Sequence, residues 1–109
     1  MKEILKVIKE RLDRVNGLRY HGEGVIKWFI GSTEEPYIVF KRQCDKKMSD
    51  NDIEKVISEM LSALDALKVD KESHTDASIN NQSFLLKGEE VINISIIPSS
   101  SLIIISTHK

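Results

Sequence analysis

The chain has 109 residues, of which 40% are hydrophobic and 30% are charged, and this balance excludes a wholly disordered or collagen-like protein. Its formal net charge of −1 provides no global field to attract nucleic acid or anionic lipid. Cys44 is the only cysteine, which excludes an internal disulfide and a zinc site built mainly from thiolates. We therefore expect a single cytoplasmic domain spanning residues 1–109, without a cofactor, a metal or a membrane segment.

The first part of the chain changes from helical to strand periodicity. Apolar residues recur every three or four positions in residues 2–16, which predicts an amphipathic helix, and Gly17 is placed to close it in a left-handed conformation. Apolar residues then alternate with polar ones in residues 18–30, which predicts a strand. Gly22 and Gly24 indicate a bend or a bulge within this strand. A turn and a second strand at residues 37–42 complete a predicted hairpin.

A second helix and three further strands are expected in the rest of the chain. Ser49 and Asp52 have the spacing of a capping box, and apolar residues keep helical spacing from there to residue 67. Residues 69–81 have no periodicity and few apolar side chains, so we expect a mobile surface loop there. The three strands are predicted at residues 83–87, 90–97 and 101–107.

The element order α-β-β-α-β-β-β predicts an α+β fold, with two helices packed on one face of a largely antiparallel five-stranded sheet. The apolar run at residues 102–105 should be an interior strand, because an exposed edge of this composition would invite aggregation. The helix between the two groups of strands leaves the strand order open, and one neighbouring pair could be parallel.

The sheet face opposite the helices is expected to be partly apolar, since alternation places Val25, Phe29, Tyr37 and Val39 there. One interpretation is the ordinary exposure of apolar residues on a protein surface. The other is a partner or dimer surface of several hundred Å². Later strands add Leu85, Val91 and Ile97 to this face, and the acidic positions expected to contribute to partner binding are Glu34, Glu35, Asp70, Glu72 and Asp76.

The histidines offer little catalytic chemistry. His21 and Glu23 are two residues apart on a predicted strand, which is the spacing of a strand-borne metal or acid–base pair. Two residues are too few for a site, and a solvated strand face is the simpler explanation. His74 is expected in the surface loop and His108 near the C-terminus, where histidines are usually only surface residues.

The basic residues form one cluster in the sequence, which consists of Lys41, Arg42, Lys46 and Lys47. Nearby acidic residues offset its charge, and no aromatic RNA-binding signature accompanies it, so we do not expect nucleic acid as a partner. Cys44 lies within this cluster without an adjacent histidine, which favours an ordinary thiol over a reactive one.

In size and layer order the predicted arrangement is similar to small binding proteins, such as type III secretion chaperones and the immunity proteins that neutralise bacterial toxins. No motif carries individual residues across. The resemblance implies a non-enzymatic inhibitor or immunity-type protein whose partner is a toxin, an effector or a second copy of the chain. The alternatives are a structural or chaperone-like assembly subunit of a secretion or phage particle, and a small metal-dependent hydrolase using His21 and Glu23.

Overall fold

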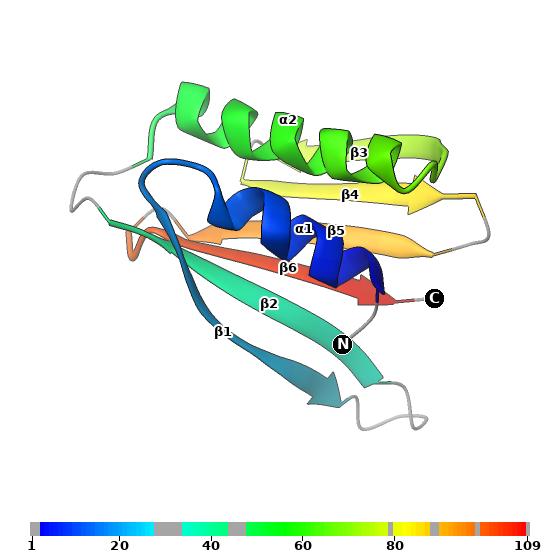
Figure 1. Ribbon diagram of the computed structural model, residues 1–109, viewed down its shortest axis with the longest axis horizontal. Coiled ribbons are helices and arrows are strands. Elements are labelled where there is room, and N and C mark those ends of the chain that lie inside the picture. The colour runs from blue at the N-terminus through cyan, green and yellow to red at the C-terminus, as the bar shows by residue number, and fades with distance from the viewer. Residues whose placement is uncertain are drawn as a thin grey trace.

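The computed structural model describes residues 3–27, 34–43, 48–78, 80–87, 90–97 and 99–108. These residues form two helices and one six-stranded antiparallel sheet, and both helices lie on the same side of the sheet (Figure 1). The α+β class and the position of the helices agree with the sequence-based prediction. The elements are α1 (Glu3–Asp13), β1 (Leu18–Lys27), β2 (Glu34–Arg42), α2 (Asp50–Ala66), β3 (Lys71–Ser78), β4 (Asn81–Leu86), β5 (Val91–Ile97) and β6 (Leu102–His108).

The strand order is β1-β2-β6-β5-β4-β3, and each neighbouring pair is antiparallel. The connection through α2 carries the chain from β2 to the far edge of the sheet, and the later strands return one by one until β6 pairs with β2 (Figure 1). β6 is therefore paired on both edges, which confirms the interior position predicted for residues 102–105. None of the helices in the described part of the chain is long and apolar enough to cross a bilayer.

The prediction of five strands and of a mobile loop at residues 69–81 is wrong, because β3 occupies most of that segment as an edge strand paired with β4. The His74 ring stacks on the Phe84 ring with centroids 4.3 Å apart, and its Nε2 lies 2.8 Å from Gln82 Oε1. The Lys71 ammonium lies 5.9 Å from the centre of the Phe84 ring. Cross-strand contacts of this kind stabilise a polar edge strand without any apolar alternation of its own.

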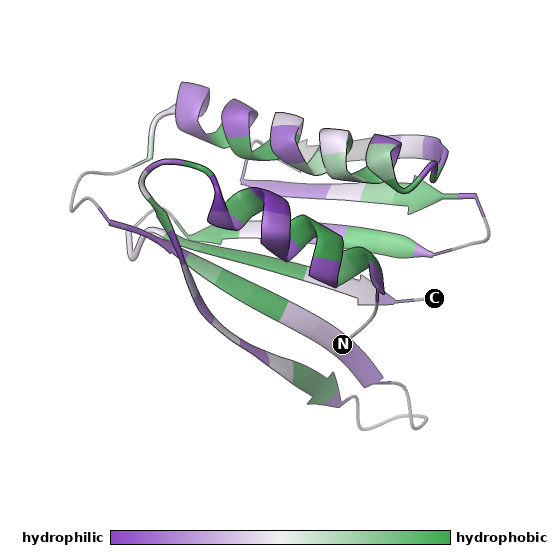
Figure 2. Cartoon of the chain, in the orientation of Figure 1, coloured by the Kyte–Doolittle hydropathy of each residue, from purple (hydrophilic) through white to green (hydrophobic). Residues whose placement is uncertain are grey.

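The core lies between the helices and the sheet. Apolar stripes of α1 and α2 pack on inward-facing residues of β2, β4, β5 and β6, and among them Leu5, Ile8, Phe40, Phe84 and Ile103 are fully buried. The hydrophilic residues of both helices face outwards, away from the sheet (Figure 2). Burying such side chains contributes about 1.5–3 kcal/mol each, which is the main stabilisation of a domain of this size.

The capping box predicted for the second helix is confirmed, whereas the predicted end of the first helix is not. α1 ends at Asp13, before the predicted residue 16, and Gly17 takes the expected left-handed conformation, with φ +90°, in the turn that leads into β1. At the start of α2, the Asp52 amide donates to Ser49 Oγ at 3.2 Å, and the Ser49 amide donates to Asp52 Oδ2 at 3.1 Å, which completes the capping box. The hydrogen bonds from the Ser49 amide and hydroxyl, together with the nearby Arg42 guanidinium, lower the pKa of Asp52.

Candidate functional site

A bulge in β1 controls which of its side chains point away from the helices. Tyr20 pairs with Phe40, but Gly22 pairs with Val39, so that His21 is an extra residue in β1 without a position of its own on β2. The glycines predicted a bulge or bend in this part of the strand, and the structure confirms it. An extra residue in one strand reverses the alternation of the side chains beyond it.

The reversal moves Val25 to the side of the sheet that carries the helices. Glu23 pairs with the core residue Ile38, and Val25 follows it on the same side, whereas Ile26 pairs with Glu35 on the other side. The prediction that Val25 shares a face with Tyr37 and Val39 is therefore wrong, because simple alternation does not account for the extra residue. Phe29 lies outside the described residues.

The sheet side opposite α1 and α2, which we call the uncovered face, has an apolar patch on β2, β6 and β5. Cross-strand pairs bring its members together, since Val39 lies opposite Ile104 and Leu102 lies opposite Ile97. Ile97 is 41% exposed, and the other three are half-buried. Tyr37 also lies on this face, as predicted, and its ring contacts Gly24. We use the name apolar patch for Val39, Ile97, Leu102 and Ile104.

A hydrogen-bonded polar network crosses the same face beside the apolar patch. Ser83 Oγ donates to Asn93 Oδ1 at 2.8 Å, and Asn93 Nδ2 lies 3.2 Å from His108 Nδ1. His108 Nδ1 lies 3.6 Å from Glu35 Oε1, to which Ser106 Oγ donates at 2.7 Å. Glu35 and Ser106 are each only 7% exposed. The network satisfies buried polar groups that would otherwise destabilise the sheet, so Glu35 has a role within the chain itself.

A cationic hollow of about 500 Å³ opens at one end of the β1–β2 pair. Arg19, His21 and Lys41 are exposed and line it, together with Arg42 and Gln43. The structure thus joins His21 and Arg19 to a basic cluster of which the sequence had indicated Lys41 and Arg42. The other members of that cluster, Lys46 and Lys47, lie outside the described residues, as does Cys44.

His21 and Glu23 do not form a shared site. His21 lines the cationic hollow, whereas Glu23 lies on the helix side, close to the Tyr20 hydroxyl. Burial, and then the nearby Glu23 carboxylate, raise the pKa of Tyr20, whose hydroxyl has no hydrogen bond of good geometry to any described residue. Within the described ranges, no group of three or more His, Cys, Asp or Glu side chains is placed to hold a metal ion.

The acidic residues predicted to bind a partner do not gather in one place. Glu34 on β2 pairs with Lys27 at 3.7 Å, and Asp70 beside β3 pairs with Lys87 at 3.5 Å. β6, β5 and β4 separate these two regions of the sheet. Glu72 is exposed on the β3 edge, and the side chain of Asp76 lies outside what the structure describes.

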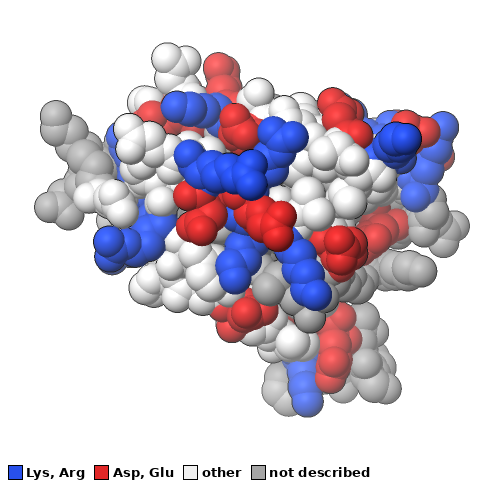
Figure 3. Space-filling model, viewed as in Figure 1, with Lys and Arg blue, Asp and Glu red and all other residues white. Residues whose placement is uncertain are grey.

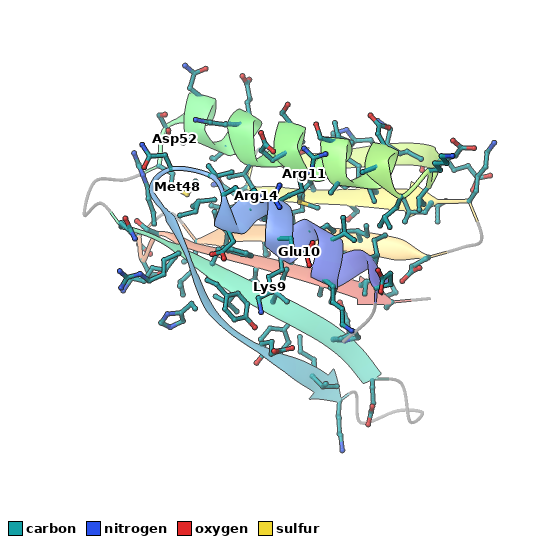
Figure 4. The ribbon with its side chains drawn as sticks, viewed as in Figure 1. Lys9, Glu10, Arg11, Arg14, Met48 and Asp52 are labelled. Carbon is teal, nitrogen blue, oxygen red and sulfur yellow. The ribbon has the colours of Figure 1, made fainter. Side chains whose placement is uncertain are left out.

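The helix layer has a different surface from the uncovered face. Its Lys, Arg, Asp and Glu side chains are interleaved, which is typical of a solvated surface (Figure 3). Lys9 extends from α1 towards the sheet, where its ammonium lies 4.0 Å from the centre of the Tyr20 ring (Figure 4). A smaller hollow of about 160 Å³ is lined by Met48 and Asp52 at the start of α2 (Figure 4), where Asp52 Oδ2 pairs with Arg42 Nη2 at 3.1 Å. The charges of Lys9, Arg42 and Asp52 therefore take part in contacts within the chain.

The hollow is the feature that sequence reasoning missed. One signal in the sequence could have indicated it. In a simple hairpin, Arg19 at the start of the first strand lies opposite the basic end of the second strand. In comparisons with known proteins, no family model, no curated protein and no solved structure matches the chain.

Proposed function

We propose that this chain is a non-enzymatic protein-binding module that occludes a protein partner with the uncovered face of its sheet. The observation that carries the proposal is the apolar patch, in which Ile97 is substantially exposed beside Leu102 and near Ile104. Contiguous exposed apolar surface on a small protein usually marks a site of interaction. The narrower form of the proposal is an inhibitor or immunity-type protein whose partner is a toxin or an effector.

The dimensions of the face fit a protein partner. Six strands spaced about 4.8 Å apart, each of about seven residues rising about 3.3 Å, give a face of roughly 650 Å². A stable complex of standard size buries about 800 Å² on each partner. The uncovered face with a few flanking residues reaches that area. The polar network limits the apolar surface to part of the face, as is usual for an interface that must also exist free in water.

The alternative of a metal-dependent hydrolase required His21 and Glu23 to act together, and the bulge in β1 places them apart. The remaining pair of interest, His108 and Glu35, belongs to the polar network, where Ser106 and Asn93 also bond to it. An arrangement in which each polar group satisfies its neighbour stabilises the sheet register and the partner-binding face.

Site-specific photocrosslinking in the native host tests the proposal. A benzophenone side chain at Ile97 should give a defined adduct with one protein, and the same side chain at Lys6 on α1 should not. The substitution Ile97→Asp should abolish capture of that protein. Val25→Asp should leave it intact, since Val25 is 50% exposed, slightly more than Ile97, but lies on the helix side.

Each outcome has a clear meaning. If Ile97→Asp captures the partner as well as the wild type does, the uncovered face is not the binding surface. An adduct between two copies of the chain, together with a dimer in analytical ultracentrifugation, would replace the toxin or effector by a homodimer as the occupant of the same face.

A further inference from the structure

The cationic hollow contains an electrostatic repulsion that nothing in the described part of the chain relieves. Arg19 and Lys41 are directly opposite on β1 and β2, with His21 next to them in the bulge. Like charges directly opposite one another destabilise a strand pair. None of these three side chains forms a hydrogen bond or an ion pair with a described residue.

Three other cations on or beside the sheet are paired with carboxylates. At the far end of the same strand pair, Lys27 lies opposite Glu34 and pairs with it at 3.7 Å. Lys87 pairs with Asp70, and the Arg42 guanidinium at the hollow itself is paired with Asp52. The two ends of the β1–β2 pair therefore differ, since opposite charges face each other at one end and like charges at the other.

The apolar patch continues directly from the hollow. Lys41 lies opposite Leu102, and Leu102 lies opposite Ile97, so a single row across the sheet passes from two cations to two aliphatic side chains. A ligand that fits this row has anionic groups next to aliphatic ones. The planar guanidinium of Arg19 suits the two oxygens of a carboxylate.

We propose that the cationic hollow binds carboxylates of an acidic segment of the protein partner, and that apolar side chains of the same segment pack on Leu102 and Ile97. This inference rests on the proposed function, since it names the chemistry of the partner at the uncovered face. A protein fits better than a nucleic acid because the row leads from the hollow to Leu102 and Ile97, which are aliphatic and offer no ring on which successive bases would stack.

Fluorescence anisotropy with defined probes tests the chemistry without knowledge of the partner. The probes are a labelled peptide of alternating Glu and Leu, the same peptide with Gln in place of Glu, and a single-stranded DNA of similar charge. The Glu peptide should bind more tightly than the Gln peptide, and its affinity should fall between about 50 and about 300 mM salt, because exposed charges are then screened.

Charge reversal locates the site. Arg19→Glu and Lys41→Glu should each weaken binding of the Glu peptide about fivefold, since an exposed attraction becomes a repulsion. Lys6→Glu is the matched control, because it makes the same charge change on the exposed side of α1, and it should bind as the wild type does. Either charge reversal at the hollow removes the opposed like charges, so these variants should be at least as stable as the wild type. A loss of peptide binding can then be attributed to the site and not to unfolding.

The results that overturn the inference differ from those that overturn the proposed function. Equal binding of the Glu and Gln peptides, no binding of the Glu peptide up to about 1 mM, or equal effects of Lys6→Glu and Arg19→Glu would each refute the acidic segment. Tighter binding of the DNA, lost on charge reversal, would assign the hollow to nucleic acid. If Ile97→Asp abolishes crosslinking to the partner while Arg19→Glu does not, the proposed function stands and the inference fails.

Discussion

Gly24 offers the sharpest test of the bulge and of the faces that it defines. A Cβ added at Gly24 would lie 2.5 Å from the hydroxyl oxygen of Tyr37, and 2.7 and 2.9 Å from two carbons of its ring. All three atoms belong to one side chain, so Gly24→Ala would force the ring to move by about 1 Å to reach ordinary van der Waals contact. Without the bulge, Gly24 would lie on the opposite face and a methyl group there would not meet Tyr37.

The expected cost follows from two opposing effects. Forcing a packed ring aside costs about 1–3 kcal/mol, and the reduced freedom of the unfolded chain returns about 0.4–1 kcal/mol. Gly24→Ala should therefore lower the free energy of unfolding by about 1–2 kcal/mol. Gly22→Ala is the matched control, because nothing lies within 4 Å of its Cβ and only the favourable effect on the unfolded chain remains.

Urea unfolding followed by circular dichroism measures both variants, and the Tyr37→Ser background completes the design. In that background the obstructing ring is gone, so Gly24→Ala should no longer destabilise the protein relative to its parent. The reasoning is refuted if Gly24→Ala and Gly22→Ala change the free energy of unfolding equally, or if the cost of Gly24→Ala persists without the Tyr37 ring.

Three further predictions concern the core and the titrating groups. Ile103→Lys should unfold the protein, because the buried unpaired charge adds to the loss of core contacts worth about 2–5 kcal/mol. Ile104→Lys lies on the uncovered face, so this variant should keep a native circular dichroism spectrum and lose only partner capture. Asp52→Ala should cost about 1 kcal/mol at neutral pH. Because the pKa of Asp52 is lower in the folded than in the unfolded state, this difference should vanish as the pH of urea titrations falls through the folded-state pKa. The pKa of Tyr20 is instead raised, so the free energy of unfolding of the wild type should fall in alkali. Tyr20→Phe should remove that fall and stabilise the protein by about 1 kcal/mol at neutral pH. If the free energy of unfolding of Tyr20→Phe falls in alkali as that of the wild type does, the buried hydroxyl is contradicted.

The sequence by itself determined the elements whose stability depends on local periodicity and local hydrogen bonds. The apolar stripes of both helices, the left-handed Gly17 and the capping box of Ser49 and Asp52 each involve residues within one or two turns of one another. The interior position of β6 also followed from composition, since a run as apolar as residues 102–105 requires partners on both edges.

Tertiary structure decided what depends on pairing between distant residues. β3 is a strand because His74 and Lys71 contact Phe84 across the hairpin, and no pattern within the segment itself indicates it. A single extra residue at His21 reverses the faces of the rest of β1. The glycines indicate that a bulge is present, but they do not predict at which residue the register shifts. The same register sets Arg19 opposite Lys41, so the cationic hollow exists only once the sheet has formed.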